Sequence, residues 1–65
     1  MYLINNSKNT ACVLHSSGTH RIYFNRSRKG TKQYIYKGKY NLALSRLLLF
    51  GYVECTEVVF NAWFK

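Results

Sequence analysis

The pattern of the chain changes once, near Gly38, and that change limits the folds open to it. Before Gly38, short runs of β-type residues span 2–5, 10–15, 20–25 and 32–37, with turn-forming residues between them. Short runs separated by Asn, Ser and Gly are typical of antiparallel strands joined by hairpins. After Gly38, the leucine-rich run 42–50 has the composition of a helix, with Asn41 as its expected N-cap and Gly51 at its end.

The C-terminal segment 52–64 alternates apolar and other residues with period two, which predicts a last strand. Glu54 and Glu57 interrupt the alternation, so a bulge or a division into two pieces is an alternative. The sequence therefore predicts an α+β fold of order β-β-β-β-α-β. In this fold a small antiparallel β-sheet of about four or five strands carries one α-helix packed on one face. All 65 residues are expected to form a single small basic domain, 1–65.

Alternation within the hairpin of 20–25 and 32–37 predicts which side chains face the core. Ile22, Phe24 and Ile35 are expected on the core side, because strand side chains alternate between two faces. The second face would carry Tyr23, Tyr34, Tyr36, Arg21 and Lys32, either exposed, paired across the strands or covered by another element. The rest of the predicted core is Leu44, Leu47, Leu48, Val58 and Phe60, with the helix buried on most sides.

Basic residues are concentrated in this hairpin, and no acidic residue precedes Glu54. Residues 21–39 hold seven of the ten Lys and Arg residues, and the chain has a formal net charge of +8. Cations interleaved with tyrosines suit a polyanion with flat bases, because cations neutralise phosphates and rings stack on bases. The predicted nucleic-acid-binding residues are Arg21, Tyr23, Arg26, Arg28, Lys29, Lys32, Tyr34, Tyr36, Lys37 and Lys39.

The function expected first is thus that of a small basic protein that binds DNA or RNA through a Lys/Arg-rich hairpin loop and neighbouring tyrosines. Over residues 20–50 the layout of sheet, basic hairpin and helix resembles the small three-stranded DNA-binding modules of phage integrases, without a shared motif. The leading strands and the C-terminal segment depart from that layout, and no residue role is carried over.

The alternative is a phage-type inhibitor or antagonist protein that binds an acidic surface of a host nuclease, toxin or polymerase. The same positive charge would then steer association with the host protein. Arg28, Tyr34, Tyr36 and Trp63 are of the residue types favoured at interaction hot spots. The C-terminal strand would also offer an edge for pairing with a second copy, giving a homodimer.

Cys12, His15, His20 and Cys55 have the chemistry of zinc ligands, but they lack the tight ligand pairs of structural zinc sites. No metal site and no cofactor is therefore predicted. Catalysis is not expected either, since the chain has no Asp and nothing places Glu54 and Glu57 in opposed environments. A Cys–His nucleophile pair or RNA cleavage by histidine would rest on residue types alone.

Targeting and membrane signals are absent from the sequence. No apolar run approaches the roughly 18–20 residues needed to span a bilayer. The first residues lack the basic and long apolar stretches of a signal peptide. We therefore expect a cytoplasmic protein with reduced cysteines and no membrane partner.

Overall fold

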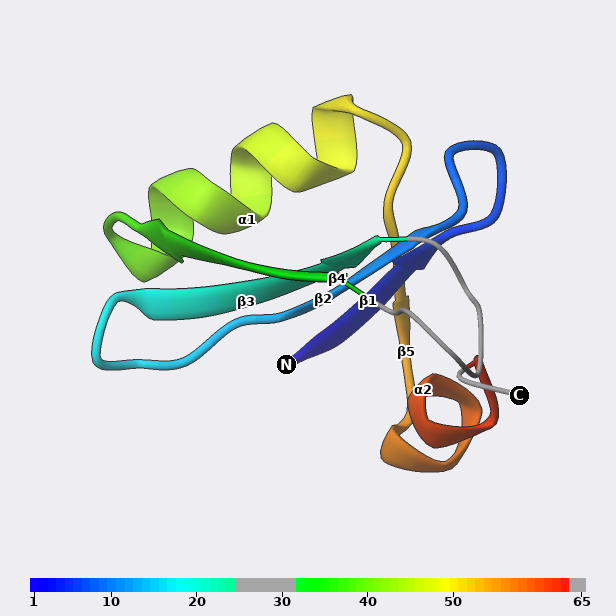
Figure 1. The fold of residues 1–65 in the computed structure, drawn as a ribbon. Helices are drawn as coiled ribbons and strands as arrows, with labels where there is room; N and C mark the ends of the chain where they lie inside the picture. The colour runs from blue at the N-terminus through cyan, green and yellow to red at the C-terminus, as the bar shows by residue number, and fades with distance from the viewer. Residues whose placement is uncertain (25–31, 64–65) are drawn as a thin grey trace.

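A computed structural model describes residues 1–24 and 32–63 of the chain. Its strands are β1 (Tyr2–Asn5), β2 (Thr10–Val13), β3 (Thr19–Phe24), β4 (Lys32–Lys37) and β5 (Val53–Cys55). Helix α1 (Tyr40–Leu49) follows β4, and helix α2 (Glu57–Trp63) follows β5. All strand pairs are antiparallel, in the order β4-β3-β2-β1-β5. The predicted α+β fold, an antiparallel sheet with one helix packed on a face, is confirmed, and α2 is added to it (Figure 1).

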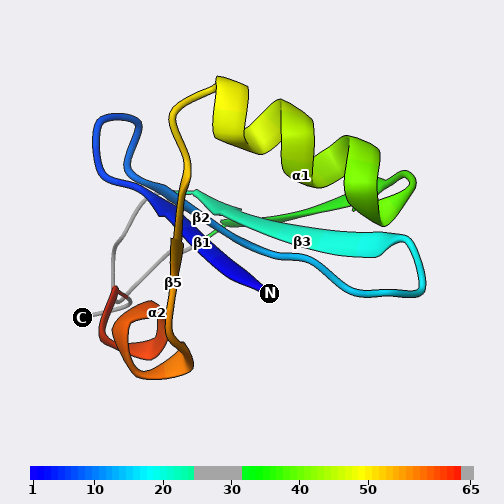
Figure 2. The same ribbon diagram turned by 180° about the vertical axis from the view of Figure 1, so that it is seen from behind.

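The sheet has a small core on each face, because α1 and α2 lie on opposite sides of it (Figure 2). β2 is the middle strand of the sheet. Its consecutive residues Ala11 and Cys12 point to opposite faces, and both are fully buried. The core under α1 contains Leu3, Cys12, Leu14, Ala43, Leu47 and Tyr52. The core under α2 contains Ala11, Phe60 and Trp63. Neither helix of the described chain has the length and apolar character needed to cross a membrane.

The prediction of one strand over the C-terminal segment is wrong beyond Cys55, where the chain turns into α2. Thr56 begins this helix, since its Oγ1 accepts a hydrogen bond from the Val59 N–H at 3.2 Å, as an N-cap does. Glu57 adds a negative charge to the first turn, which the helix dipole favours. Phe60 and Trp63 lie three residues apart, on one side of the helix, and both are buried. Residues 57–63 therefore offer no strand edge for pairing with a second copy, and the predicted homodimer stays a prediction.

The hairpin register also differs from the prediction. Ile22 lies opposite Tyr34, and Arg21 lies opposite Ile35. Residues directly opposite share a face, so Tyr34, Tyr36 and Lys32 lie on the α1 side with Ile22 and Phe24, while Ile35 lies on the α2 side. The prediction placed Ile22, Phe24 and Ile35 together on one core face and left open whether the other face is covered. Because this sheet has cores on both faces, apolar residues are needed on both, and alternation alone does not specify the register.

The helix α1 is less buried than predicted. It begins at Tyr40 rather than after Asn41, and its N-cap residue, Lys39, makes no side-chain capping hydrogen bond. Among its residues Ala43 and Leu47 are buried, and Leu48 is 51% exposed. The helix end is as expected, with Gly51 at φ +96° after the C-cap Phe50. Of the predicted core, Leu47 and Phe60 are buried, Ile22 and Leu44 are half-buried, and Phe24, Ile35, Leu48 and Val58 are exposed.

A buried histidine connects three segments that are distant in sequence. His20 is fully buried. Its Nδ1 accepts a hydrogen bond from the His15 N–H at 3.1 Å, so Nε2 carries the proton and donates to the Gly38 carbonyl at 2.8 Å. The Gly38 N–H donates in turn to the Gly18 carbonyl at 2.9 Å. A Cβ on Gly18, which has φ +88°, would lie 3.2 Å from the Gly38 oxygen. The β2–β3 turn is thereby joined to the chain that enters α1.

The burial of Leu47 predicts a large loss of stability in Leu47→Ala, about 2–5 kcal/mol, because the substitution removes core contacts and leaves a cavity. Leu49→Ala is the matched control, since Leu49 is 86% exposed on the same helix. The control should change the free energy of unfolding by no more than about 0.5 kcal/mol. Urea unfolding followed by circular dichroism measures both, and equal losses would contradict the buried face assigned to α1.

His20→Leu should cost about 1–3 kcal/mol, because the His15 amide and the Gly38 carbonyl lose their partner. His15→Leu keeps the backbone amide that makes the bond and changes only an exposed side chain, so it should be nearly neutral. Thermal unfolding of the two variants provides the test. Similar melting temperatures would show that the His20 bridge contributes little.

Candidate nucleic-acid interface

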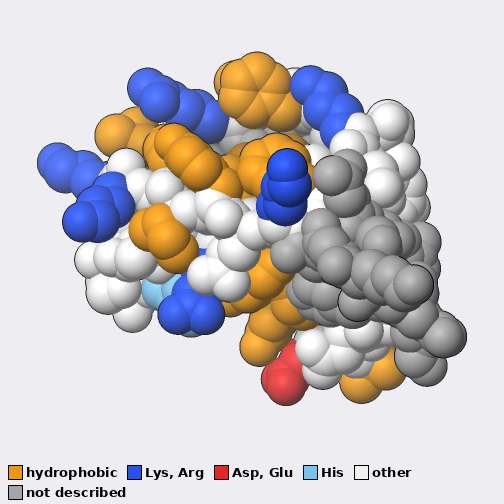
Figure 3. Space-filling model, viewed as in Figure 1, with side chains coloured by type: hydrophobic (Ala, Val, Ile, Leu, Met, Phe, Trp, Pro, Cys, Tyr) orange, Lys and Arg blue, Asp and Glu red, His pale blue; other side chains and the backbone are white. Residues whose placement is uncertain are grey.

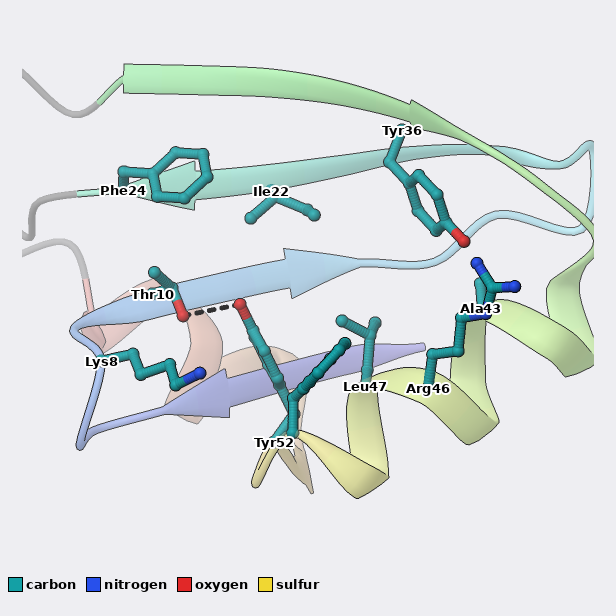
Figure 4. A pocket seen from close by; sticks show the side chains of 10 residues that line it. Lys8, Thr10, Ile22, Phe24, Tyr36, Ala43, Arg46, Leu47 and Tyr52 are labelled. Atoms are coloured by element: carbon teal, nitrogen blue, oxygen red, sulfur yellow. Dashed lines mark hydrogen bonds between the residues drawn. The ribbon is translucent and has the colours of Figure 1, made fainter.

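A groove of about 370 Å³ lies between α1 and the half of the sheet that contains β3 and β4 (Figure 4). Its walls are mostly apolar, and no Asp or Glu is among the residues that line it. They come from the β1–β2 turn, β2, β3, β4, α1 and the segment after α1: Lys8, Thr10, Ile22, Phe24, Tyr36, Ala43, Arg46, Leu47, Phe50 and Tyr52. The groove is therefore an apolar site, and the charged residues that line it within 1–24 and 32–63, Lys8 and Arg46, are cations.

One buried amide, Asn5, holds the Lys8 end of the groove. Asn5 Oδ1 accepts a hydrogen bond from the Lys8 N–H at 3.2 Å, and Nδ2 donates to the Phe50 carbonyl at 3.1 Å. Lys8 Nζ then lies 5.5 Å from the centroid of the Phe50 ring, a cation–π contact. Asn5 therefore fixes the β1–β2 turn against the end of α1.

A pair of hydroxyls lies among the apolar lining residues. Thr10 Oγ1 and Tyr52 Oη are 2.6 Å apart (Figure 4). Burial raises the pKa of the Tyr52 phenol above its usual value, and nearby Cys12 adds to this, while the Thr10 hydrogen bond opposes it. The phenol is thus protonated at neutral pH. With Thr10 donating to it, Tyr52 keeps its own proton for another acceptor.

The groove is continuous with exposed residues of β3 and β4 on the same side of the sheet. Tyr34 is 57% exposed and Phe24 is 38% exposed, and Lys32 lies directly opposite Phe24. We call this surface the basic aromatic face: Lys8, Phe24, Lys32, Tyr34, Tyr36 and Arg46. Figure 3 shows hydrophobic side chains gathered on this side of the molecule, with Lys and Arg side chains around them.

The structure divides the predicted site residues between the two sides of the sheet. Lys32, Tyr34 and Tyr36 lie on the basic aromatic face. Arg21, Tyr23 and Lys37 lie on the opposite, α2 side. Tyr23 is half-buried there, with its ring centroid 5.9 Å from that of Phe60, so it packs as a core residue.

The remaining predicted residues lie near the ends of β4 in sequence. Arg26, Arg28 and Lys29 fall outside the described residues, so their part in binding stays a prediction. Lys39 is exposed just before α1. Together with Lys37 it borders a second depression, of about 520 Å³, which is also lined by Ser16, Ser17 and Thr19.

Sequence reasoning missed Lys8, Arg46 and Phe50, which the fold brings to the groove. The run 40–50 contains one charged residue, Arg46, and that isolation was the available signal. Arg46 and Phe50 are four residues apart, the spacing that puts two side chains on the same side of a helix. Lys8 is 42 positions from Phe50 in the sequence, so no local pattern could associate them.

Charge is segregated across the sheet. The chain has two acidic residues, Glu54 on β5 and Glu57 on α2, and β5 is the edge opposite β4. The cations Lys32 and Lys37 lie on β4 itself, and Lys39 follows it. A polyanion is therefore attracted toward the β4 edge and away from β5.

The candidate metal ligands form no cluster in the described chain, and neither candidate thiol nucleophile is activated. In the described ranges, no three His, Cys, Asp or Glu side chains are grouped so that they could hold a metal ion. Both ring nitrogens of His20 are in hydrogen bonds within the protein. Burial raises the pKa of the Cys12 thiol to about 12. Burial and the Glu54 charge raise that of Cys55. Neither thiol has the lowered pKa of an activated nucleophile.

Comparison of the chain with known protein families, with curated proteins and with solved structures found no match.

Thiol labelling tests the two cysteine environments. Cys12 is fully buried and Cys55 is partly exposed, so Ellman's reagent at pH 8 should label one thiol per folded chain, more slowly than a free thiol because the pKa of Cys55 is raised. Two thiols should react in guanidinium chloride. Labelling of the folded protein should disappear in Cys55→Ser. Two thiols that react at the same rate in the folded protein would contradict the burial of Cys12.

Proposed function

We propose that the protein binds single-stranded nucleic acid, DNA or RNA, on the basic aromatic face. The observation that carries the proposal is the arrangement of Lys32 and Tyr34 on β4. They are two positions apart, so an exposed cation and an exposed ring lie next to each other on the face that contains the groove. Phosphates would pair with the cations while bases stack on the rings.

The overall charge distribution supports this partner. The net charge of +8 attracts a polyanion, and both carboxylates lie on β5 and α2, away from the β4 edge. Lys8, Lys32 and Arg46 are exposed, so their charges are available to phosphate groups. Binding of this kind releases counterions and weakens as the salt concentration rises.

Single strands suit this face better than duplexes. Tyr34 and Phe24 are exposed rings on a sheet, and a ring can stack only on a base that is unpaired and accessible. α1 is less suited to reading the bases of a duplex, because its exposed residues include Leu42, Leu48 and Leu49 beside the polar Asn41, Ser45 and Arg46.

A protein partner is the second candidate, favoured by the exposed apolar residues of α1. Leu42 is 58% exposed, Leu49 is 86% exposed and Phe50 is 61% exposed. An inhibitor of an acidic host protein would use these side chains together with the surrounding cations. In a pull-down after nuclease treatment, one stoichiometric partner protein that binds the wild type but not Leu42→Ser/Leu49→Ser would favour the inhibitor function.

Two charge-matched double variants test which face binds. Lys32→Gln/Arg46→Gln removes two cations from the basic aromatic face, and Arg21→Gln/Lys37→Gln removes two from the opposite side. Each lowers the net charge by two. Fluorescence anisotropy with a labelled single-stranded 12-mer should show at least a tenfold loss of affinity for the first. Its log–log salt slope should fall by about 1.4, at about 0.7 per phosphate contact.

The second variant should lose much less affinity and keep its slope, and both should melt within a few degrees of wild type. Equal losses in the two variants would mean that net charge alone attracts the oligonucleotide. No binding by the wild type at low salt would end the proposal.

A further inference from the structure

We infer that the groove between α1 and β3–β4 receives one unstacked nucleobase, whose flanking phosphates lie against Lys8 and Arg46. This inference rests on the proposed function and adds a base-binding site to it. Of the residues that line the groove, only Tyr36 was among the nucleic-acid-binding residues predicted from the sequence. The groove thus gives the face a second mode of contact, beyond stacking on exposed rings.

The shape and lining of the groove suit a flat, mostly apolar ring. Its volume of about 370 Å³ lies at the lower end of the range for small-ligand sites, about 300–1,000 Å³. Phe24, Tyr36 and Phe50 supply aromatic surface, and Ile22 and Leu47 supply aliphatic surface. A single ring system fits within this volume.

Charge at the groove identifies an anionic occupant rather than a neutral one. Figure 4 shows Lys8 and Arg46 at opposite ends of the set of lining side chains, with the apolar residues between them. A nucleotide within a strand has this pattern, a flat base with a phosphate on each side. The Lys8 position is held by its backbone bond to Asn5 and by the Phe50 ring, so the cation is already in place before a ligand arrives.

Thr10, Tyr36 and Tyr52 bring hydroxyl groups to the groove, and that of Tyr52 can serve a base. The Tyr52 hydroxyl accepts from Thr10 at 2.6 Å and can donate its own proton to a ring nitrogen or carbonyl oxygen of the base. Every nucleobase has such an acceptor. The site should therefore bind bases in general and discriminate modestly among them.

Two decamers with the same charge separate base insertion from phosphate binding. One is oligothymidylate, and the other carries tetrahydrofuran abasic residues throughout. Wild-type protein should bind the first at least about tenfold more tightly, because each stacked base contributes on that scale. Tyr52→Phe should reduce this ratio about fivefold through the lost hydrogen bond and leave abasic binding unchanged. Tyr40→Phe is the matched control, since Tyr40 lies outside the groove, and it should change neither value.

Photocrosslinking then locates the base without a variant. A central 4-thiothymidine in the first decamer should crosslink to Phe24, Tyr36 or Phe50, as identified by mass spectrometry. Crosslinks only to Tyr34, or a ratio in Tyr52→Phe equal to that of the wild type, would overturn the inference and leave the proposed function standing. Equal affinity for both decamers would overturn the inference together with the base stacking of the proposed function. Failure of both decamers to bind would instead overturn the proposed function.

Discussion

Two short helices must cover the two faces of a five-stranded sheet. Because the helices are too small to do so, parts of both faces remain exposed. α1 has ten residues and α2 has seven. α1 lies roughly along β3, and a helix with its side chains is only about 10–12 Å in diameter (Figure 1). Five strands about 4.8 Å apart extend about 19 Å across. α2 packs near β1, and α1 lies over the other face (Figure 1). Neither face is covered completely, and the groove lies where the cover of α1 over β3 and β4 ends.

Because the helices cover the sheet incompletely, its two halves differ in how well their faces are packed. Around β1 and β2, both faces are packed, with Leu3, Cys12 and Ala11 fully buried. Around β4, Tyr34 and Ile35 remain exposed on opposite faces. The carboxylates lie with the packed half, near β5, and much of the positive charge lies with the open half. The exposed Lys32 and Tyr34 of the open half can therefore vary with little effect on the cores, whereas Leu47 and Tyr52 belong both to a core and to the groove.

Local sequence signals were sufficient for most of the elements. β1 and β4 have the predicted bounds, and Gly51 ends α1 because its positive φ suits glycine. α2 was missed because period-two alternation through Val58 and Phe60 competes with a helical signal, the Thr56 cap and the Phe60–Trp63 spacing. The hairpin register was missed because a sheet with two cores needs apolar residues on both faces. The conformation of α2 is decided by the burial of Phe60 and Trp63 against the sheet. The hairpin register is decided by the packing of helices on both faces of the sheet.

The groove and its cations could not be predicted, because they depend on contacts between residues far apart in the chain. Asn5 joins the β1–β2 turn to the Phe50 carbonyl, and Thr10 meets Tyr52 across 42 positions. An asparagine at the end of a strand and a threonine at the start of another carry no sequence signal of these partners. Arg46 was visible as the one charge in its helix, but its position beside the groove follows only from the packing of Leu47 and Ala43 beneath it.

The His20 bridge has a consequence for the motions of the molecule. The His15 amide belongs to a surface turn, where amides ordinarily exchange hydrogen with water within seconds to minutes by local fluctuation. Here that amide is bonded to a fully buried ring, which is bonded in turn to the residue two positions before α1. Releasing the turn requires the ring to leave its site, which also frees the start of the helix. The turn and the first residues of α1 should therefore open as one cooperative unit, and a turn amide should exchange as slowly as an amide of the core.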